Sequence, residues 1–164
     1  MLDKLKTLVD DAADECREDD GELYGIEKAL KDVAKRLRIK FIGNGSFRAA
    51  FLHENVVYKV PLDSEGVEHN FREYNLWKSS RGKLRSHLAR VLGIEKDILL
   101  MEYAGRTLYA ARKFTYDDSY DGFMNWAYDE LTKRYKRMGI PWVDADISVS
   151  NITVSRKVID YAGC

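Results

Sequence analysis

Three short apolar runs separated by tight polar turns, between residues 39 and 60, constrain the fold of this chain most strongly. The runs are Ile39–Ile42, Phe47–Leu52 and Val56–Val60, and the segments 43–46 and 53–55 form the turns between them. Turns this short join antiparallel neighbours, because a parallel pair needs a crossover of roughly a dozen residues or more. The segment therefore predicts an antiparallel meander that ends at Pro61.

Later segments extend this pattern to an α+β fold. The runs Leu88–Ile94 and Ile98–Tyr103 predict a second hairpin, so five strands could form one sheet. Residues 67–79 have helical periodicity and are expected to pack on that sheet. A further helix is predicted over residues 123–138, and a last small hairpin over 152–154 and 158–160. The helix over 123–138 is expected to bury one side, which consists of Met124, Ala127, Leu131 and Met138.

Two amphipathic helices are predicted before the sheet, over residues 2–20 and 26–37. The first carries an acidic face and is expected to stop at Gly21, whereas the second carries a basic face. The sequence leaves three roles open for this pair of helices, namely capping the fold, mediating dimerisation and binding a partner.

Composition narrows the class of protein. The chain has 164 residues, 45% of them apolar, which is about one domain with a real core. It has 27 basic and 27 acidic residues, and this net charge of zero argues against a nucleic-acid partner. No apolar run reaches the roughly 18–20 residues of a membrane span. Neither Cys16 nor Cys164 has metal-type spacing, so we expect a reduced, cytoplasmic protein. The oligomeric state stays open.

The first candidate for chemistry is the glycine-rich turn Gly43-Asn44-Gly45-Ser46. Glycine lets backbone N–H groups approach phosphate oxygens without an intervening side chain. A plain hairpin turn explains the same residues.

The second candidate is Lys59, inside an apolar strand. A buried ammonium is costly unless it has a partner, although an edge-strand lysine can also reach water. Glu73, at the border of the apolar arc of the 67–79 helix, is the better available partner, because Glu68 lies farther round toward solvent.

The third candidate combines Asp146, Asn151 and Asp160. A carboxylate such as that of Asp146 can orient or deprotonate an attacking hydroxyl. Asn151 and Asp160 flank the predicted last hairpin, where facing residues lie roughly 5 Å apart, and both offer oxygen ligands suited to Mg²⁺. Turn-capping and surface roles account for each residue taken singly.

In this order, these parts resemble the protein-kinase-like superfamily over roughly residues 38–164. The turn resembles the nucleotide-covering loop, and Val57-Tyr58-Lys59 the strand that ends in the phosphate-pairing lysine. Met101-Glu102-Tyr103-Ala104-Gly105 resembles the hinge between lobes. Asp146-x-x-x-x-Asn151 is similar to the catalytic loop, and Asp160-Tyr161-Ala162 to the metal-binding Asp-Phe-Gly.

The resemblance implies ATP and Mg²⁺ as cofactors and a phosphotransferase whose acceptor is a protein Ser/Thr hydroxyl. Asp146 would be the base, Lys59 and Glu73 would position phosphates, and Asn151 and Asp160 would hold the metal. Nucleotide contacts would come from the loop and hinge regions, namely Gly43, Asn44, Gly45, Ser46, Val57, Lys59, Met101, Glu102 and Ala104. The implied organisation is a helical extension over residues 1–37, a five-stranded N-lobe over 38–104 and a truncated, mostly helical C-lobe over 105–164.

Some positions depart from the family pattern. Arg48 stands where the loop's third glycine is usual, and Asp144-Ala145 precedes Asp146 in place of His-Arg. The activation segment and later helices have no counterpart before Cys164. Two alternatives therefore stay open beside the enzyme. They are a catalytically inactive kinase-shaped module that binds nucleotide or protein, and an unrelated α+β domain.

Overall fold

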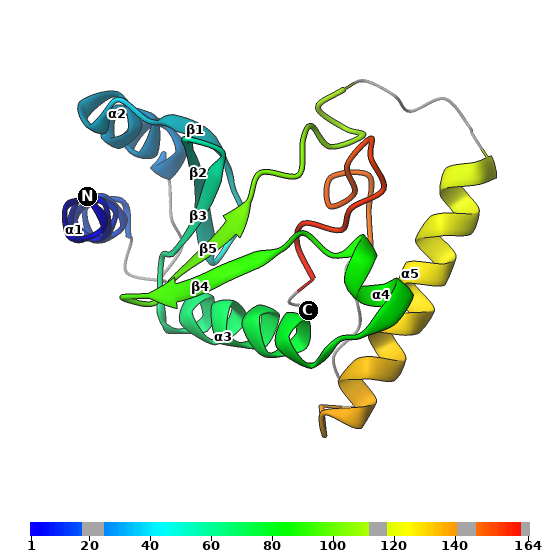
Figure 1. Ribbon diagram of the computed structural model, residues 1–164. Coiled ribbons are helices and arrows are strands. Elements are labelled where there is room, and N and C mark those ends of the chain that lie inside the picture. The colour runs from blue at the N-terminus through cyan, green and yellow to red at the C-terminus, as the bar shows by residue number, and fades with distance from the viewer. Residues whose placement is uncertain (18–24, 112–117, 141–146, 162–164) are drawn as a thin grey trace. The chain divides into compact units, whose positions relative to one another are not determined.

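A computed structural model describes residues 1–17, 25–111, 118–140 and 147–161 (Figure 1). The chain divides into two compact units. The first unit consists of Met1–Phe71 and Val91–Tyr103, and the second unit of Arg72–Arg90 and Ala104–Cys164. No helix in the described part of the chain combines the length and apolar character that crossing a bilayer requires.

The first unit is built on an antiparallel sheet of five strands, as the sequence predicts. The strands are β1 (Lys40–Asn44), β2 (Arg48–His53), β3 (Val56–Pro61), β4 (Val91–Glu95) and β5 (Ile98–Glu102), in the spatial order β1-β2-β3-β5-β4. Two of the connections are two-residue turns, Glu54-Asn55 and Lys96-Asp97, and all four residues have positive φ. Positive φ at both central positions defines the type I′ turn, whose twist matches that of paired strands.

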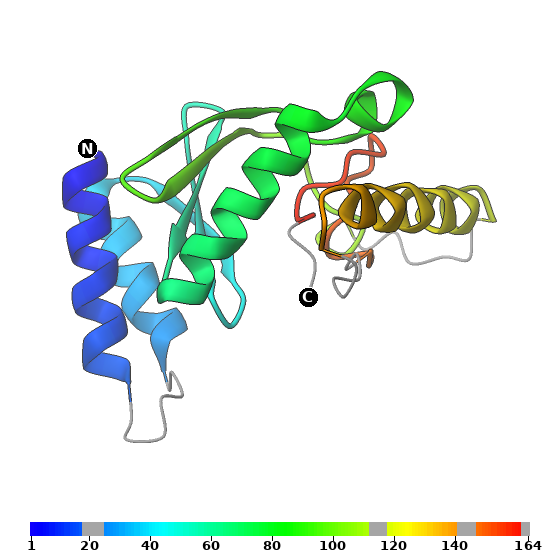
Figure 2. The same cartoon turned by 90° about the horizontal axis from the view of Figure 1, so that it is seen from below.

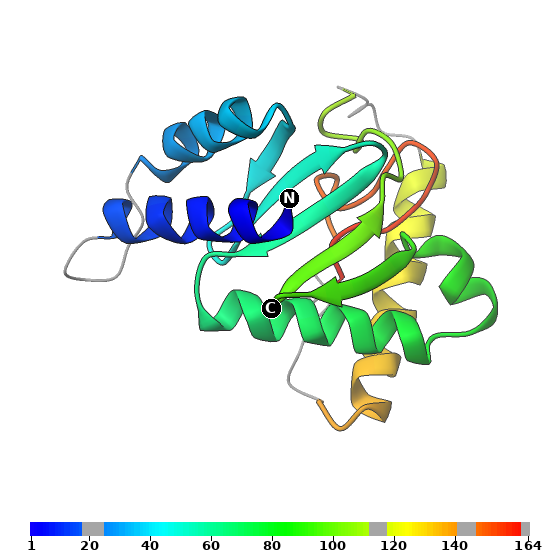
Figure 3. The ribbon, with the colours of Figure 1, turned by 60° about the vertical axis from the view of Figure 1, so that its left-hand side comes forward.

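Two N-terminal helices, α1 (Leu2–Cys16) and α2 (Ile26–Leu37), lie side by side against this sheet (Figures 2 and 3). Their apolar stripes are buried together with one face of the sheet, in a single core. The sheet contributes Ala49, Phe51, Tyr58, Val60 and Ile98, and the helices contribute Leu5, Val9, Ala12, Ala13, Ile26, Leu30, Val33 and Ala34. Of the three roles left open for the helix pair, capping the fold is therefore confirmed.

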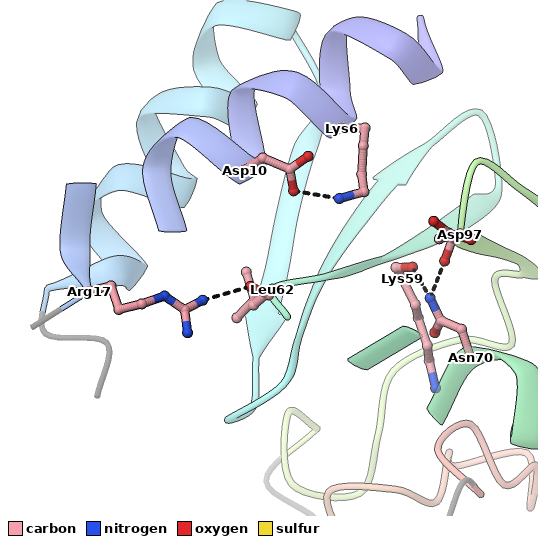
Figure 4. A network of polar contacts seen from close by, with 7 residues as sticks. All are labelled: Lys6, Asp10, Arg17, Lys59, Leu62, Asn70 and Asp97. Carbon is pink, nitrogen blue, oxygen red and sulfur yellow. Dashed lines mark hydrogen bonds and ion pairs between the residues drawn. The ribbon is translucent and has the colours of Figure 1, made fainter. Parts of the chain in front are cut away.

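Polar contacts fasten α1 at both of its ends. Arg17, directly after the helix, donates from Nη2 to the carbonyl oxygen of Leu62 at 3.1 Å (Figure 4). At the other end, Asp3 forms an ion pair with Lys96 of the β4–β5 turn. The helix pair is thus an integral layer of the first unit.

Helix α3 (Ser64–Ser79) follows β3 and begins with a side-chain cap. The Oδ1 atom of Asp63 accepts a hydrogen bond from the N–H of Gly66 at 2.8 Å, which satisfies one of the donors that every helix start leaves unpaired. The helix starts three residues earlier than the apolar periodicity predicts. The periodicity does not show this start, because the Asp63 cap is polar and adds nothing to an apolar repeat. The second unit begins within this helix, at Arg72.

The second unit contains α4 (Gly82–His87), α5 (Asp118–Arg137) and a small hairpin. The hairpin is confirmed in reduced form, as an antiparallel bridge between Ile152 and Val158. On α5, Ala127 and Leu131 are buried as predicted, but the next buried position is Tyr135. Met124 and Met138 are only half-buried, so the predicted apolar side was partly wrong.

The predicted strand over Leu88–Ile94 is wrong in its first part. Leu88 forms a parallel bridge with Val158, and the N–H of Ala89 donates to the Val158 carbonyl oxygen at 2.9 Å. These residues are apolar because they are buried in the second unit. Helix α4 was not predicted, since its six residues are too short to show a period.

Other helix boundaries also differ from the predicted ones. Helix α1 ends at Cys16, and the predicted stop at Gly21 lies outside the described residues. The short helix expected within residues 106–121 falls largely in the undescribed 112–117, and α5 begins at Asp118.

Gly66 offers a direct test of how α3 is seated. A Cβ at this position would lie 2.1 Å from the carbonyl oxygen of Phe47, a backbone atom that cannot turn aside. We expect Gly66→Ala to lower the free energy of unfolding by about 1–3 kcal/mol, as overpacking does, in urea titrations.

Gly122→Ala on α5 is the matched control. Its Cβ would meet nothing within 4 Å, so the helix propensity of alanine should raise stability by up to about 1 kcal/mol. If Gly66→Ala were as stable as the wild type, this description of the contact between α3 and the β1–β2 turn would be wrong.

Candidate functional site

Lys59 lies in the middle of β3, paired with Ala50 of β2 and Leu99 of β5. Its neighbours Tyr58 and Val60 belong to the core beneath α1 and α2. Since side chains alternate along a strand, the Lys59 side chain is on the opposite face of the sheet, and Figure 4 shows it extending away from the two helices. Only 7% of Lys59 is exposed, so this ammonium is not a snorkelling surface group.

A fully buried amide, Asn70 of α3, holds the backbone of Lys59. Its Nδ2 atom donates to the Lys59 carbonyl oxygen at 2.9 Å and to the Asp97 carbonyl oxygen at 2.6 Å (Figure 4). Its Oδ1 atom accepts from Nη1 of Arg48 at 3.2 Å. One side chain thus joins α3 to β2, to β3 and to the β4–β5 turn.

The glycine-rich turn presents backbone to solvent at its tip. The N–H of Gly45 donates to the Arg48 carbonyl oxygen at 3.0 Å, and the Phe47 carbonyl oxygen accepts from the N–H of Leu62 at 2.9 Å. Asn44, Gly45 and Ser46 are exposed. A Cβ added at Gly43 or Gly45 would meet nothing within 4 Å, so packing does not require glycine at either position, although the φ of +155° at Gly43 favours glycine there.

The remaining first-unit candidates lie on paired strands. Val57 of β3 pairs with Met101 of β5, which is 2% exposed, and Glu102 follows it at the strand end. The N–H of Tyr103 donates to the Asn55 carbonyl oxygen at 2.8 Å, which continues the pairing past β5. Ala104 belongs to the second unit, where its carbonyl oxygen accepts from Oγ of Ser155 at 3.2 Å.

Tyr58, next to Lys59, is an ordinary core phenol. Burial, followed by the nearby Glu54 carboxylate, raises the pKa of Tyr58 above its usual 10.0. Tyr58 therefore stays neutral at physiological pH and packs beneath the helix pair without a charge.

In the second unit, Glu73 contacts the backbone of Tyr161, the residue after Asp160. Glu73 is fully buried, and its Oε1 atom accepts a hydrogen bond from the N–H of Tyr161 at 3.3 Å. Tyr161 directly follows Asp160 in the chain. The sequence placed Glu73 at the border of the apolar arc, but it lies on the buried line of α3 that also includes Asn70 and Leu76.

Tyr161 fixes the backbone beside Asp160 from several directions. Its side chain is fully buried, and its hydroxyl donates to the Ala89 carbonyl oxygen at 2.9 Å. Its own carbonyl oxygen accepts a hydrogen bond from the hydroxyl of Tyr135 on α5. Together with the Glu73 contact, these bonds use the donor and acceptor groups of Tyr161 to hold the chain at Asp160 in place.

Asn151 lies across the small hairpin from Asp160. Its carbonyl oxygen accepts from the N–H of Ile159 at 2.9 Å, one residue before Asp160. Among the described residues, no three His, Cys, Asp or Glu side chains gather as a cation site. An asparagine and a carboxylate that keep bound water and phosphate oxygens are nevertheless a suitable donor set for Mg²⁺, which rarely uses an all-protein cage.

Asp146 and the neighbouring Asp144 lie outside the described residues. The described candidates therefore form two groups, each within one unit. The first unit holds Lys59, Val57, Met101, Glu102 and the turn residues 43–46, and the second holds Ala104, Glu73, Asn151 and Asp160.

Sequence reasoning overlooked the role of Asn70. The signal was present, since Asn70 shares the predicted apolar side of its helix with Val67, Tyr74 and Trp77. A polar side chain on a buried face must be hydrogen-bonded, and it therefore marks a structural junction.

Comparison with protein-family models and curated sequences supplies no relative. No protein-family model matches the chain, and no curated protein sequence matches it either.

Asn70→Asp tests whether this amide holds the Lys59 segment. The substitution keeps the shape but replaces the two-bond Nδ2 donor with an oxygen that faces two carbonyl oxygens. We expect the free energy of unfolding in urea to fall by roughly 3 kcal/mol, because buried polar groups lose their partners.

The control for this substitution is Asn75→Asp, on the exposed side of the same helix. It should change stability by no more than about 0.5 kcal/mol. Equal effects of the two substitutions would show that Asn70 does not act through its buried bonds.

Proposed function

We propose that the protein is an ATP- and Mg²⁺-dependent phosphotransferase of kinase-like form, with a protein Ser/Thr hydroxyl as acceptor. The observation that carries the proposal is the contact between the buried Glu73 carboxylate and the N–H of the residue after Asp160. It brings the Glu73 carboxylate to the backbone directly after Asp160, 87 positions further along the sequence, and phosphoryl transfer would use these two residues together. If the motifs were a coincidence, there would be no reason to expect Glu73 beside the segment that contains Asp160.

The order of elements supports the same proposal. A lysine on the third strand, a buried glutamate on the helix that follows, and two further strands are the parts that a kinase-like N-lobe requires. The open turn of residues 43–46 adds a second argument. The backbone conformation of Gly43 accounts for that glycine, but Gly45 is needed neither for packing nor for a positive φ, so a close approach of phosphate to the backbone accounts for it.

The proposed reaction needs little covalent chemistry from the protein. The acceptor oxygen forms a bond to the γ-phosphorus, the bond from that phosphorus to the β,γ-bridging oxygen breaks, and ADP leaves. Asp146 takes the hydroxyl proton, and Lys59 binds the phosphates. Asn151 and Asp160 would hold Mg²⁺, which when bound neutralises phosphate charge.

Nucleotide binding is the first test. We expect Mg-ATP at a hundredfold excess over its dissociation constant to stabilise the protein by about 2.7 kcal/mol, measured as a rise in melting temperature. Lys59→Met should abolish the rise, whereas Lys35→Met on the exposed face of α2 should leave it intact. A wild-type protein that Mg-ATP does not stabilise would contradict the proposal.

Transfer is the second test. With labelled ATP and a mixture of Ser/Thr peptides, Lys59→Met and Asp160→Asn should each lower the rate by roughly a hundredfold or more, because each removes a charge that stabilises the transferring group. Mg-ATP binding without transfer to any acceptor would identify a nucleotide-binding module instead. Transfer that survives Asp160→Asn unchanged would refute the metal assignment.

A further inference from the structure

The zero net charge of the chain conceals a division between its two units. The first unit has 12 basic and 18 acidic residues, a net charge of −6, whereas the second has 15 basic and nine acidic residues, a net charge of +6. The net charge of the whole chain therefore describes neither unit. The excess positive charge of the second unit is concentrated in residues 74–90, which contain five Lys or Arg and no carboxylate.

Five cations gather at the short helix α4, and we call them the α4 cationic cluster. Arg81, Lys83 and Arg85 lie on or directly before α4. The other two members come from the hairpin turn, where Nζ of Lys157 donates to the Ser86 carbonyl oxygen at 2.9 Å and the Arg156 carbonyl oxygen lies 3.0 Å from Nδ1 of His87. All of these contacts lie within the second unit.

Aromatic rings support three of these cations. Nζ of Lys83 lies 4.5 Å from the ring centre of Trp126, and Cζ of Arg85 lies 3.7 Å from that of Trp77. Cζ of Arg156 lies 5.3 Å from the ring centre of Tyr120. A guanidinium laid on a ring keeps its N–H donors in the plane, directed outward, which pre-organises it for phosphate.

Three members of the cluster keep their charge available. Arg81, Lys83 and Arg85 make no ion pair with a carboxylate among the residues that the structure describes, and Arg81 and Lys83 are exposed. Protein interfaces are depleted of lysine and built around an apolar centre, yet no large hydrophobic side chain of α4 is exposed. Strongly cationic surfaces with partly exposed rings are typical of nucleic-acid interfaces.

We propose that the α4 cationic cluster binds the phosphate backbone of single-stranded nucleic acid. Lys and Arg contact the phosphates, and the edges of Trp77 and Trp126 line the surface. The inference does not depend on the proposed phosphotransferase, because none of the residues assigned to nucleotide or metal belongs to the cluster.

The test is fluorescence anisotropy of a labelled oligothymidylate, titrated with the full chain at several salt concentrations. Three phosphate contacts, from Arg81, Lys83 and Arg85, predict a slope of log K against log salt of about −2.1. Lys83→Glu combined with Arg85→Glu should weaken binding at low salt by roughly tenfold or more and reduce the size of the slope by about 1.4. Circular dichroism would verify folding, and Arg81→Gln with Lys83→Gln offers a milder variant at exposed positions.

The matched control reverses two exposed lysines of α2, Lys28→Glu with Lys35→Glu, which makes the same change in the net charge of the chain but in the other unit. It should bind oligothymidylate like the wild type. The proposal is overturned if the oligonucleotide does not bind at low salt, or if the control loses as much affinity as the α4 variant. Polyglutamate binding as tight as oligothymidylate binding would also overturn it, since the surface would then suit acidic proteins.

Discussion

The buried amide of Asn70 is the constraint on which the first unit most depends. A fully buried side chain with two donated bonds and one accepted bond tolerates few rearrangements, because each displaced partner leaves a polar group unsatisfied. The amide fixes the start of α3 against β3 at Lys59, while the close approach of Gly66 to Phe47 fixes it against the β1–β2 turn. Lys59, the proposed phosphate-binding residue, thus stands on a strand held by buried hydrogen bonds rather than on a loop.

A second buried polar junction organises the other unit. Tyr161 is bound through its N–H to Glu73, through its hydroxyl to Ala89 and through its carbonyl oxygen to Tyr135. The buried Glu73 carboxylate joins α3 to the segment that contains Asp160, and this is why the Glu73 contact carries more weight than any single motif.

The sequence predicted more of the sheet than of the second unit, for physical reasons. Alternation and short turns identify antiparallel strands locally, so β1, β2, β3 and β5 fell within a few residues of expectation. The apolar residues Leu88 and Ala89 read equally well as a strand, because periodicity reports burial and not the partner. The proximity of Glu73 to Tyr161 follows from tertiary folding, and no local sequence pattern predicts it. The charge division was also hidden, because a sum over the chain loses the placement of charges.

The central claim is that the ammonium of Lys59 contacts the phosphates of a bound nucleotide. An acyl-phosphate derivative of ATP tests it directly, since the acyl group moves to a lysine amine at the phosphates while ATP leaves, and mass spectrometry of the digested protein identifies the lysine. The account predicts Mg²⁺-dependent acylation of Lys59 that unlabelled ATP suppresses. Acylation that avoids Lys59, or that excess ATP does not reduce at Lys59, would contradict it.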